Sequence, residues 1–268
     1  MFVVLTLLHV MIVTTFPNIG LATNKYSENI DKAQRFYYND DDSVLVGTSL
    51  ASGIIQDSIS PVKLMAFAGT SPQDGLKIIL SRERLPKVVF IETNLLYQEE
   101  SNEVFTNKVT NGYMAEIKRY IPSLREQYTP MNIFNWILKE VILGGEKVSS
   151  REVNLNVLNG NIERMVNSDK CLESDVLKER RKNVRQLVEN LQKAGVHVVF
   201  FEMPVNKKVV NLRMFEQNRE ASLEDFPQTV NTWIPNDTSI YITSDGMHLD
   251  MEGKERYSHY IKQCIATL

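Results

Sequence analysis

The chain has 268 residues, of which 43% are hydrophobic and 24% are charged, and its formal net charge is −3. This composition is close to the globular average and excludes a disordered chain, and the length allows one large domain or two small ones. The weakly acidic balance does not favour a protein that binds nucleic acid, because such proteins have a basic face. Two cysteines, Cys171 and Cys264, exclude a disulfide scaffold and an all-cysteine zinc site but leave open a single bridge in an oxidising compartment.

The N-terminal segment is apolar. Residues 2–16 contain no Lys, Arg, Asp or Glu. This run is shorter than the about 20 apolar residues of a membrane-spanning helix and is typical of the apolar region of a signal peptide. Small residues at Gly20 and Ala22 favour a signal-peptide cleavage site. If the segment is not cleaved, it would be a membrane anchor. The alternative is a buried helix or strand of the domain. We expect residues 1–22 to be a signal peptide or membrane anchor, residues 23–43 to be a polar linker, and the domain to lie outside the cytoplasm.

Residues 44–268 alternate between short apolar runs and helical patterns. Ser71, for example, is a good N-cap and is followed by Pro72 at the first helical position. The expected strands are 44–46, 64–68, 88–91, 196–201 and 239–242, and the expected helices are 50–59, 72–84, 174–194 and 252–266. Short strands that alternate with helices predict an α/β fold in which helices cover both faces of a parallel sheet.

Residues 95–170 interrupt this alternation. Helical patterns surround Ile117 and Trp136, and the segment is too long for an ordinary connection. We expect a mostly helical insertion over the carboxyl edge of the sheet. The alternative is a set of packing helices with no role at a functional site.

Ser49 is a candidate nucleophile. It follows the first predicted strand directly, in the run Gly47-Thr48-Ser49-Leu50, and opens a predicted helix. A serine at this position projects from the carboxyl end of the sheet, where ligands bind in open α/β folds. Its hydroxyl can attack a carbonyl carbon while its own backbone N–H, near the helix N-terminus, holds the oxyanion. The alternative is a helix N-cap without a catalytic role.

Asp245 and His248 are the candidate partners of this serine. They lie three residues apart just before the last predicted helix, so they can meet across one turn of chain. A serine nucleophile needs a base, and the base needs a carboxylate that orients it. The other histidines outside the leader, His197 and His259, are expected to be packed or structural residues. The alternative is a turn formed by Asp245 beside a surface histidine.

Two further residues follow predicted strands. Gly69 can present a backbone N–H, and Asn94 can present a side-chain amide. Both strands are expected beside the strand that precedes Ser49, so these groups predict an oxyanion hole. Gly and Asn are also ordinary residues at the end of a strand.

The residues Ser49, Gly69, Asn94 and His248 occur in the order of the SGNH hydrolases, also called GDSL esterases, and residues 44–268 resemble that family outside the insertion. The resemblance implies that Ser49 is the nucleophile, His248 the base and Asp245 its orienting carboxylate. It also implies that Gly69 and Asn94 are oxyanion donors together with the Ser49 amide. The implied fold is a flavodoxin-like three-layer sandwich with a central parallel sheet.

Two residues depart from the family's pattern. Thr48 stands where the family has aspartate, and Glu92 stands where it has glycine. Glu92 is expected either to bind a substrate hydroxyl or to pair with Arg119, Arg125 or Arg213. The alternative is that it points away from the site and accepts from a backbone amide.

These features predict serine-dependent hydrolysis of an ester or transfer of an acyl group such as acetyl. The expected substrate is an O-acylated cell-surface carbohydrate or a small ester. Membrane association is expected through residues 2–22, and neither a cofactor nor a metal is expected, since no His-x-x-x-His or Cys-x-x-Cys spacing occurs. The alternative from another class is a non-catalytic carbohydrate-binding or assembly protein that retains the fold.

Overall fold

A computed structural model describes residues 2–16, 19–20, 25–142 and 153–268, so the expected cleavage site around Ala22 lies outside the described residues. The chain forms two compact units. Unit 1 comprises residues 1–39 and 104–149, and unit 2 comprises residues 40–103 and 150–268. The N-terminal segment and most of the predicted insertion therefore belong to the same unit.

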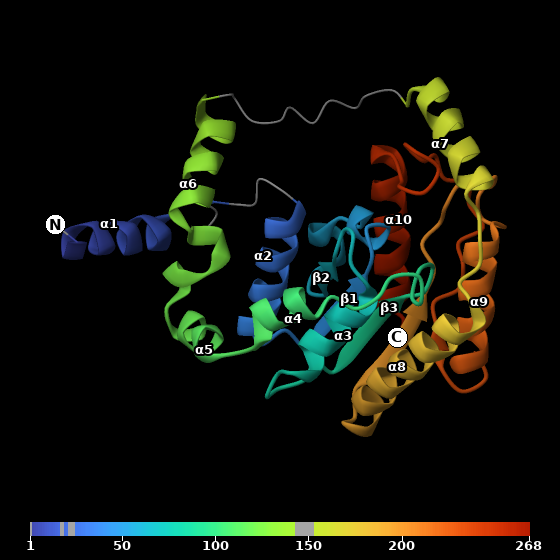
Figure 1. Cartoon of the computed structure of the whole chain (residues 1–268), viewed down its shortest axis with the longest axis horizontal. Coiled ribbons are helices and arrows are strands. Elements are labelled where there is room, and N and C mark those ends of the chain that lie inside the picture. The colour runs from blue at the N-terminus through green and yellow to red at the C-terminus, as the bar shows by residue number, and fades with distance from the viewer. Residues whose placement is uncertain (1, 17–18, 21–24, 143–152) are drawn as a thin grey trace. The chain divides into compact units, whose positions relative to one another are not determined.

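Unit 2 contains a five-stranded sheet with the order β2-β1-β3-β4-β5. The strands are β1 (Ser43–Gly47), β2 (Lys63–Ala66), β3 (Val88–Glu92), β4 (His197–Phe201) and β5 (Thr232–Trp233). Every neighbouring pair is parallel. This order is that of flavodoxin-like folds and confirms the predicted α/β class (Figure 1).

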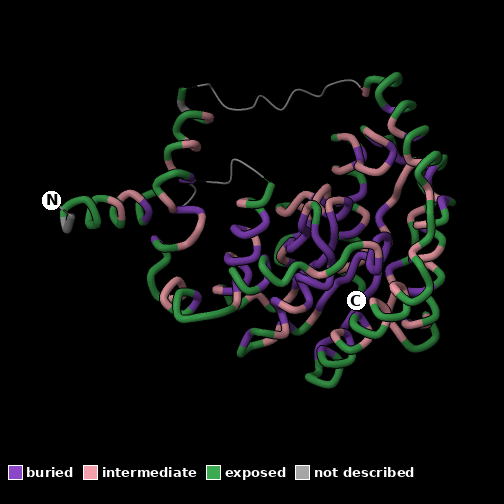
Figure 2. The backbone as a smooth tube through the Cα atoms, in the orientation of Figure 1, coloured by how far each residue is buried: buried purple, intermediate pink, exposed green. Residues whose placement is uncertain are grey.

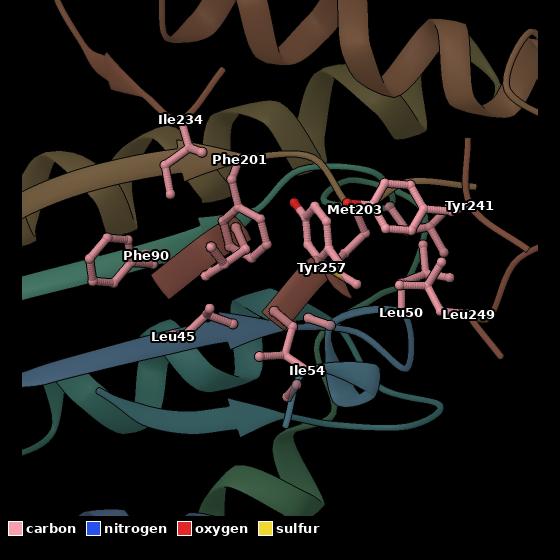
Figure 3. Close-up of a cluster of buried hydrophobic side chains, with 14 of the residues drawn as sticks. Leu45, Leu50, Ile54, Phe90, Phe201, Met203, Ile234, Tyr241, Leu249 and Tyr257 are labelled. Carbon is pink, nitrogen blue, oxygen red and sulfur yellow. The ribbon is translucent and has the colours of Figure 1, made fainter. Parts of the chain in front are cut away.

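Helices cover both faces of the sheet. Unit 2 contains α3 (Pro72–Leu80), α7 (Leu155–Asn167), α8 (Ser174–Lys193), α9 (Arg213–Asp225), α10 (Met251–Ile265) and the short 3-10 helices η1 (Ala51–Gly53) and η2 (Gln56–Ile59). Side chains alternate along each strand, so Leu45, Phe90 and Phe201 lie on one face and pack with Tyr257 of α10 (Figure 3). On the other face α3 packs on β1 and β2, and α8 packs on β4 and on α3. The result is the predicted three-layer sandwich.

Unit 1 is helical in its described residues. It contains α1 (Phe2–Thr15), α2 (Lys25–Tyr38), α5 (Tyr113–Tyr120), η3 (Pro122–Leu124), η4 (Glu126–Tyr128), α6 (Pro130–Trp136), the π-helix η5 (Ile137–Ile142) and all but the first residue of α4 (Glu103–Thr110). The segment expected as a linker contains α2, in which seven residues are buried. No helix in the described part of the chain is long and apolar enough to cross a membrane.

Three local predictions are wrong. The helix expected at 50–59 is split into η1 and η2, because Ile54 and Ile55 are extended and the Ile55 amide donates to the Ser258 hydroxyl at 2.9 Å. The strand expected at 239–242 does not form, and the fifth strand is instead β5. His197 is exposed, not packed, and Cys171 and Cys264 are both free thiols.

The start of α3 gives a stability prediction. The Ser71 hydroxyl accepts from the Gln73 amide at 3.2 Å, and Ser71 is fully buried. Ser71→Ala removes this cap and should lower the free energy of unfolding by about 1 kcal/mol, measured by urea denaturation. Ser168→Ala, at an exposed position after α7, is the matched control and should change it by less than about 0.5 kcal/mol. Equal effects of the two variants would contradict the role of the cap.

Candidate active site

Ser49 lies two residues beyond the carboxyl end of β1. The next strand along the chain, β2, pairs with one edge of β1, whereas β3 pairs with the other edge of β1. The crevice outside the strands at such a switch point is where open α/β sheets bind ligands. The position predicted for the nucleophile is therefore the position that the topology favours.

Three side chains form a connected chain at this position. Ser49 Oγ lies 3.0 Å from His248 Nε2, and His248 Nδ1 lies 2.7 Å from Asp245 Oδ2. An ionised Asp245 accepts a hydrogen bond from His248 Nδ1, so it favours the tautomer with the proton on Nδ1. That tautomer leaves Nε2 free to accept the Ser49 hydroxyl proton. The three predicted residues are thus brought together in the geometry of a nucleophile, a base and an orienting carboxylate.

The loop around Asp245 is fixed by its own hydrogen bonds. Asp245 Oδ1 accepts from the backbone amides of Met247, at 3.0 Å, and of His248, at 2.8 Å. Burial opposes ionisation of Asp245, but the bonds from the His248 ring and from these two amides outweigh it and hold the pKa of Asp245 well below its usual range. The carboxylate therefore stays charged beside the imidazole over the whole neutral range.

Helix α7 packs against the same loop. Gly246 has a φ of +103°, and a Cβ there would lie 2.6 Å from Met165 and 3.0 Å from Ile162, both on α7. Only glycine fits both this backbone conformation and this close approach. The sequence placed residues 155–167 in the insertion, which was expected over the carboxyl edge of the sheet or, as the alternative, as packing helices with no role at a functional site. In the structure these residues form α7, which packs against the loop that holds Asp245 and His248.

The two departures from the family pattern bind each other. Glu92 Oε2 accepts from the Thr48 amide and from the Thr48 hydroxyl, each at 2.7 Å, and the Thr48 hydroxyl accepts from the Leu50 amide at 3.2 Å. A Cβ on Gly47 would lie 3.0 Å from the Glu92 carboxylate, so glycine allows this approach. Thr48 is thus bound directly to the end of β3, and Leu50 is bound to Thr48.

The expected substrate contact of Glu92 is wrong for this structure. Glu92 has no exposed surface, and its Oε2 accepts from the amide and the hydroxyl of Thr48. The alternative, an acceptor for a backbone amide, is the arrangement found. Burial raises the pKa of Glu92, and the hydrogen bonds from Thr48 offset this only in part.

The candidate oxyanion donors have different environments. The side chain of Asn94 is buried and bound to the backbone of Met203, with Nδ2 donating to the carbonyl at 2.9 Å and the amide donating to Oδ1 at 2.6 Å. Gly69 is exposed in a turn with a φ of +74°, and a Cβ there would meet no atom within 4 Å. The oxyanion role of Gly69, Asn94 and the Ser49 amide stays a prediction. The helix dipole expected at Ser49 is absent, because η1 has only three residues.

Neither a metal site among the residues that the structure describes nor a known relative adds to this geometry. Within the described residues, no three His, Cys, Asp or Glu side chains are grouped as a metal site. Comparison with models of known protein families finds no match, and neither does a search of curated protein sequences.

The buried carboxyl of Glu92 predicts a pH effect on stability. Above the ordinary carboxyl pKa of about 4.5 and below the raised pKa of Glu92, the folded chain keeps a proton that the unfolded chain has lost. Stability contributed by this group is therefore lost as pH rises through that window. Glu92→Gln removes the ionisation, so the stability of the variant relative to the wild type should rise with pH, by at most about 1.4 kcal/mol per pH unit. Urea unfolding at several pH values measures this difference, and a difference independent of pH would contradict the raised pKa.

Proposed function

We propose that the protein is a serine-dependent esterase or acyltransferase of the SGNH type that acts outside the cytoplasm on an O-acylated carbohydrate. The observation that supports it most is the connected arrangement of Ser49, His248 and Asp245 at the switch point of the sheet. The location outside the cytoplasm depends on the apolar residues 2–16 alone.

The arrangement supports a two-step acyl transfer. His248 Nε2 takes the Ser49 proton as Oγ bonds to the acyl carbon, and Asp245 stabilises the imidazolium. The tetrahedral intermediate then collapses, His248 returns the proton to the leaving alcohol, and the acyl group stays on Ser49. In the second step water or a sugar hydroxyl gives its proton to His248 and takes the acyl group, which restores the Ser49 hydroxyl.

A cavity of about 170 Å³ lies next to Asn94, and Asn94 and Met203 form part of its wall. Its other polar lining side chains are Glu202, Arg219, Asn236, Asp237, Ser239 and Tyr257, and its apolar lining residues are Pro204, Val205 and Val210. The polar side chains supply hydrogen-bonding partners for the hydroxyls of a carbohydrate ester.

The non-catalytic alternative depended on Thr48 and Glu92. Because these residues bind each other, their departure from the family pattern leaves the Ser49 hydroxyl directed at His248. A binding protein has no need of this bond or of the Asp245 carboxylate behind it. The geometry therefore favours the enzyme.

Replacement of the nucleophile tests the proposal. Ser49→Ala should reduce turnover of p-nitrophenyl acetate by several orders of magnitude and abolish labelling by a fluorophosphonate, because the three residues act as a unit. Ser58→Ala, at a half-buried serine in η2, is the control and should keep both properties. A folded wild-type chain that neither turns over the ester nor takes the label would support the carbohydrate-binding alternative.

The orienting carboxylate has its own signature. Asp245→Asn keeps the shape of the side chain but removes the charge that stabilises the imidazolium, so kcat should fall by about 10⁴. The substituted amide also favours the wrong imidazole tautomer. Loss of less than about tenfold, with chemistry limiting and the fold intact by circular dichroism, would exclude Asp245 from this role.

A further inference from the structure

We propose that unit 1 docks on the surface of an anionic lipid bilayer through α1 together with the segment from α5 to η5. The proposal is independent of the esterase, because unit 1 contains none of Ser49, Asp245 and His248. It extends the expected membrane association beyond residues 2–22 to a second, distant stretch of the chain.

The first observation is the exposure of α1. Residues 2–16 have no charged side chain, and most described residues of α1 are exposed (Figure 2). The exposed large apolar residues include Val4, Leu5, Leu7, Leu8 and Met11. Contact with lipid removes such uncharged apolar side chains from water.

The second observation is a set of exposed apolar and aromatic side chains along residues 113–142. Met131, Phe134 and Ile142 are each 60% exposed or more, and Tyr113 and Tyr120 are 81% and 76% exposed. Large apolar side chains exposed in such number indicate an interaction site. Tyrosine suits the boundary between hydrocarbon and water, because its ring is apolar and its hydroxyl is polar.

The two stretches are held together in the structure. Val13 of α1 forms a small buried cluster with Ile19 and Tyr128, and Ile133 and Trp136 of the α6 segment pack on this cluster. His9 Nε2 of α1 also lies 3.1 Å from the Ser123 carbonyl oxygen of η3. The exposed apolar residues of α5, α6 and η5 therefore belong to the same packed unit as α1, so one membrane can contact both stretches.

Charge favours an anionic lipid surface over a second copy of the chain. Residues 1–39 and 104–149 contain 9 Lys and Arg against 6 Asp and Glu, whereas the rest of the chain contains 21 against 27. Two copies that met through unit 1 would bring like charges together. An anionic bilayer instead attracts the basic unit that bears the exposed apolar residues.

The test uses flotation of the full chain with vesicles of phosphatidylcholine and phosphatidylglycerol. The variant Met131→Gln/Phe134→Gln/Leu138→Gln keeps α1 intact and should bind at least about tenfold more weakly. The control Val230→Gln/Ile240→Gln/Ile242→Gln changes exposed apolar residues of unit 2 and should bind as the wild type does. Both variants should keep the p-nitrophenyl acetate activity of the wild type, which separates this test from that of the esterase.

A second readout places α6 relative to the lipid. Trp136 and Trp233 are the two tryptophans of the chain, so Trp233→Phe leaves Trp136 as the single tryptophan, which is excited selectively over tyrosine. Brominated lipids should quench Trp136 in vesicles that contain phosphatidylglycerol. Absence of quenching, or equal binding by the wild type and the triple variant of α6 and η5, would overturn the proposal. A variant that loses dimerisation in solution while it keeps lipid binding would show that a second copy covers this surface, and would overturn it too.

Discussion

The hydrogen bonds between Thr48 and Glu92 are the constraint on which the site depends. The backbone ladder between β1 and β3 has its last pair at Val46 and Ile91, so beyond that pair the strands have no common backbone bonds that hold them in register. The Glu92 carboxylate extends the connection by binding both the amide and the hydroxyl of Thr48. On the other side of β3, the side chain of Asn94 closes two bonds with the backbone of Met203 beyond β4. Residues 92–94 therefore fix three strand ends at the height of the nucleophile.

Two carboxyl groups near the site have opposite environments. Asp245 is half-exposed and receives hydrogen bonds from the His248 ring and two amides, so its pKa is lowered and it stays charged beside the imidazole. Glu92 is fully buried and its pKa is raised, so its negative charge is disfavoured. Its Oε2 accepts from the amide and the hydroxyl of Thr48, so this contact of Glu92 is with the protein and not with solvent.

Sequence patterns predicted β1 to β4 and the grouping of Ser49, Asp245 and His248, because these depend on short local apolar runs and on residue types with few other uses. The pairing of Thr48 with Glu92 joins residues 44 positions apart, so each alone looked like a defect of the family pattern. The fifth strand was misplaced for a similar reason. Residues 240–242 are β-branched or aromatic, as is common in strands, but Trp233 stacks on Phe200 of β4 and donates to the Phe226 carbonyl. The pairing with β4 therefore places β5 earlier in the chain. Likewise, no local pattern indicated that residues 1–39 and 104–149 form one unit.

That grouping changes how an N-terminal membrane attachment would act on unit 2. A single polar linker at 23–43 would let unit 2 move over a distance set by the linker length. The chain instead passes between the units three times, after residues 39, 103 and 149. Three covalent connections leave unit 2 fewer relative positions than one linker does. If unit 1 docks on lipid as proposed, unit 2 is tethered to the same membrane through all three connections, and the proposed esterase acts on substrates within the reach of those connections.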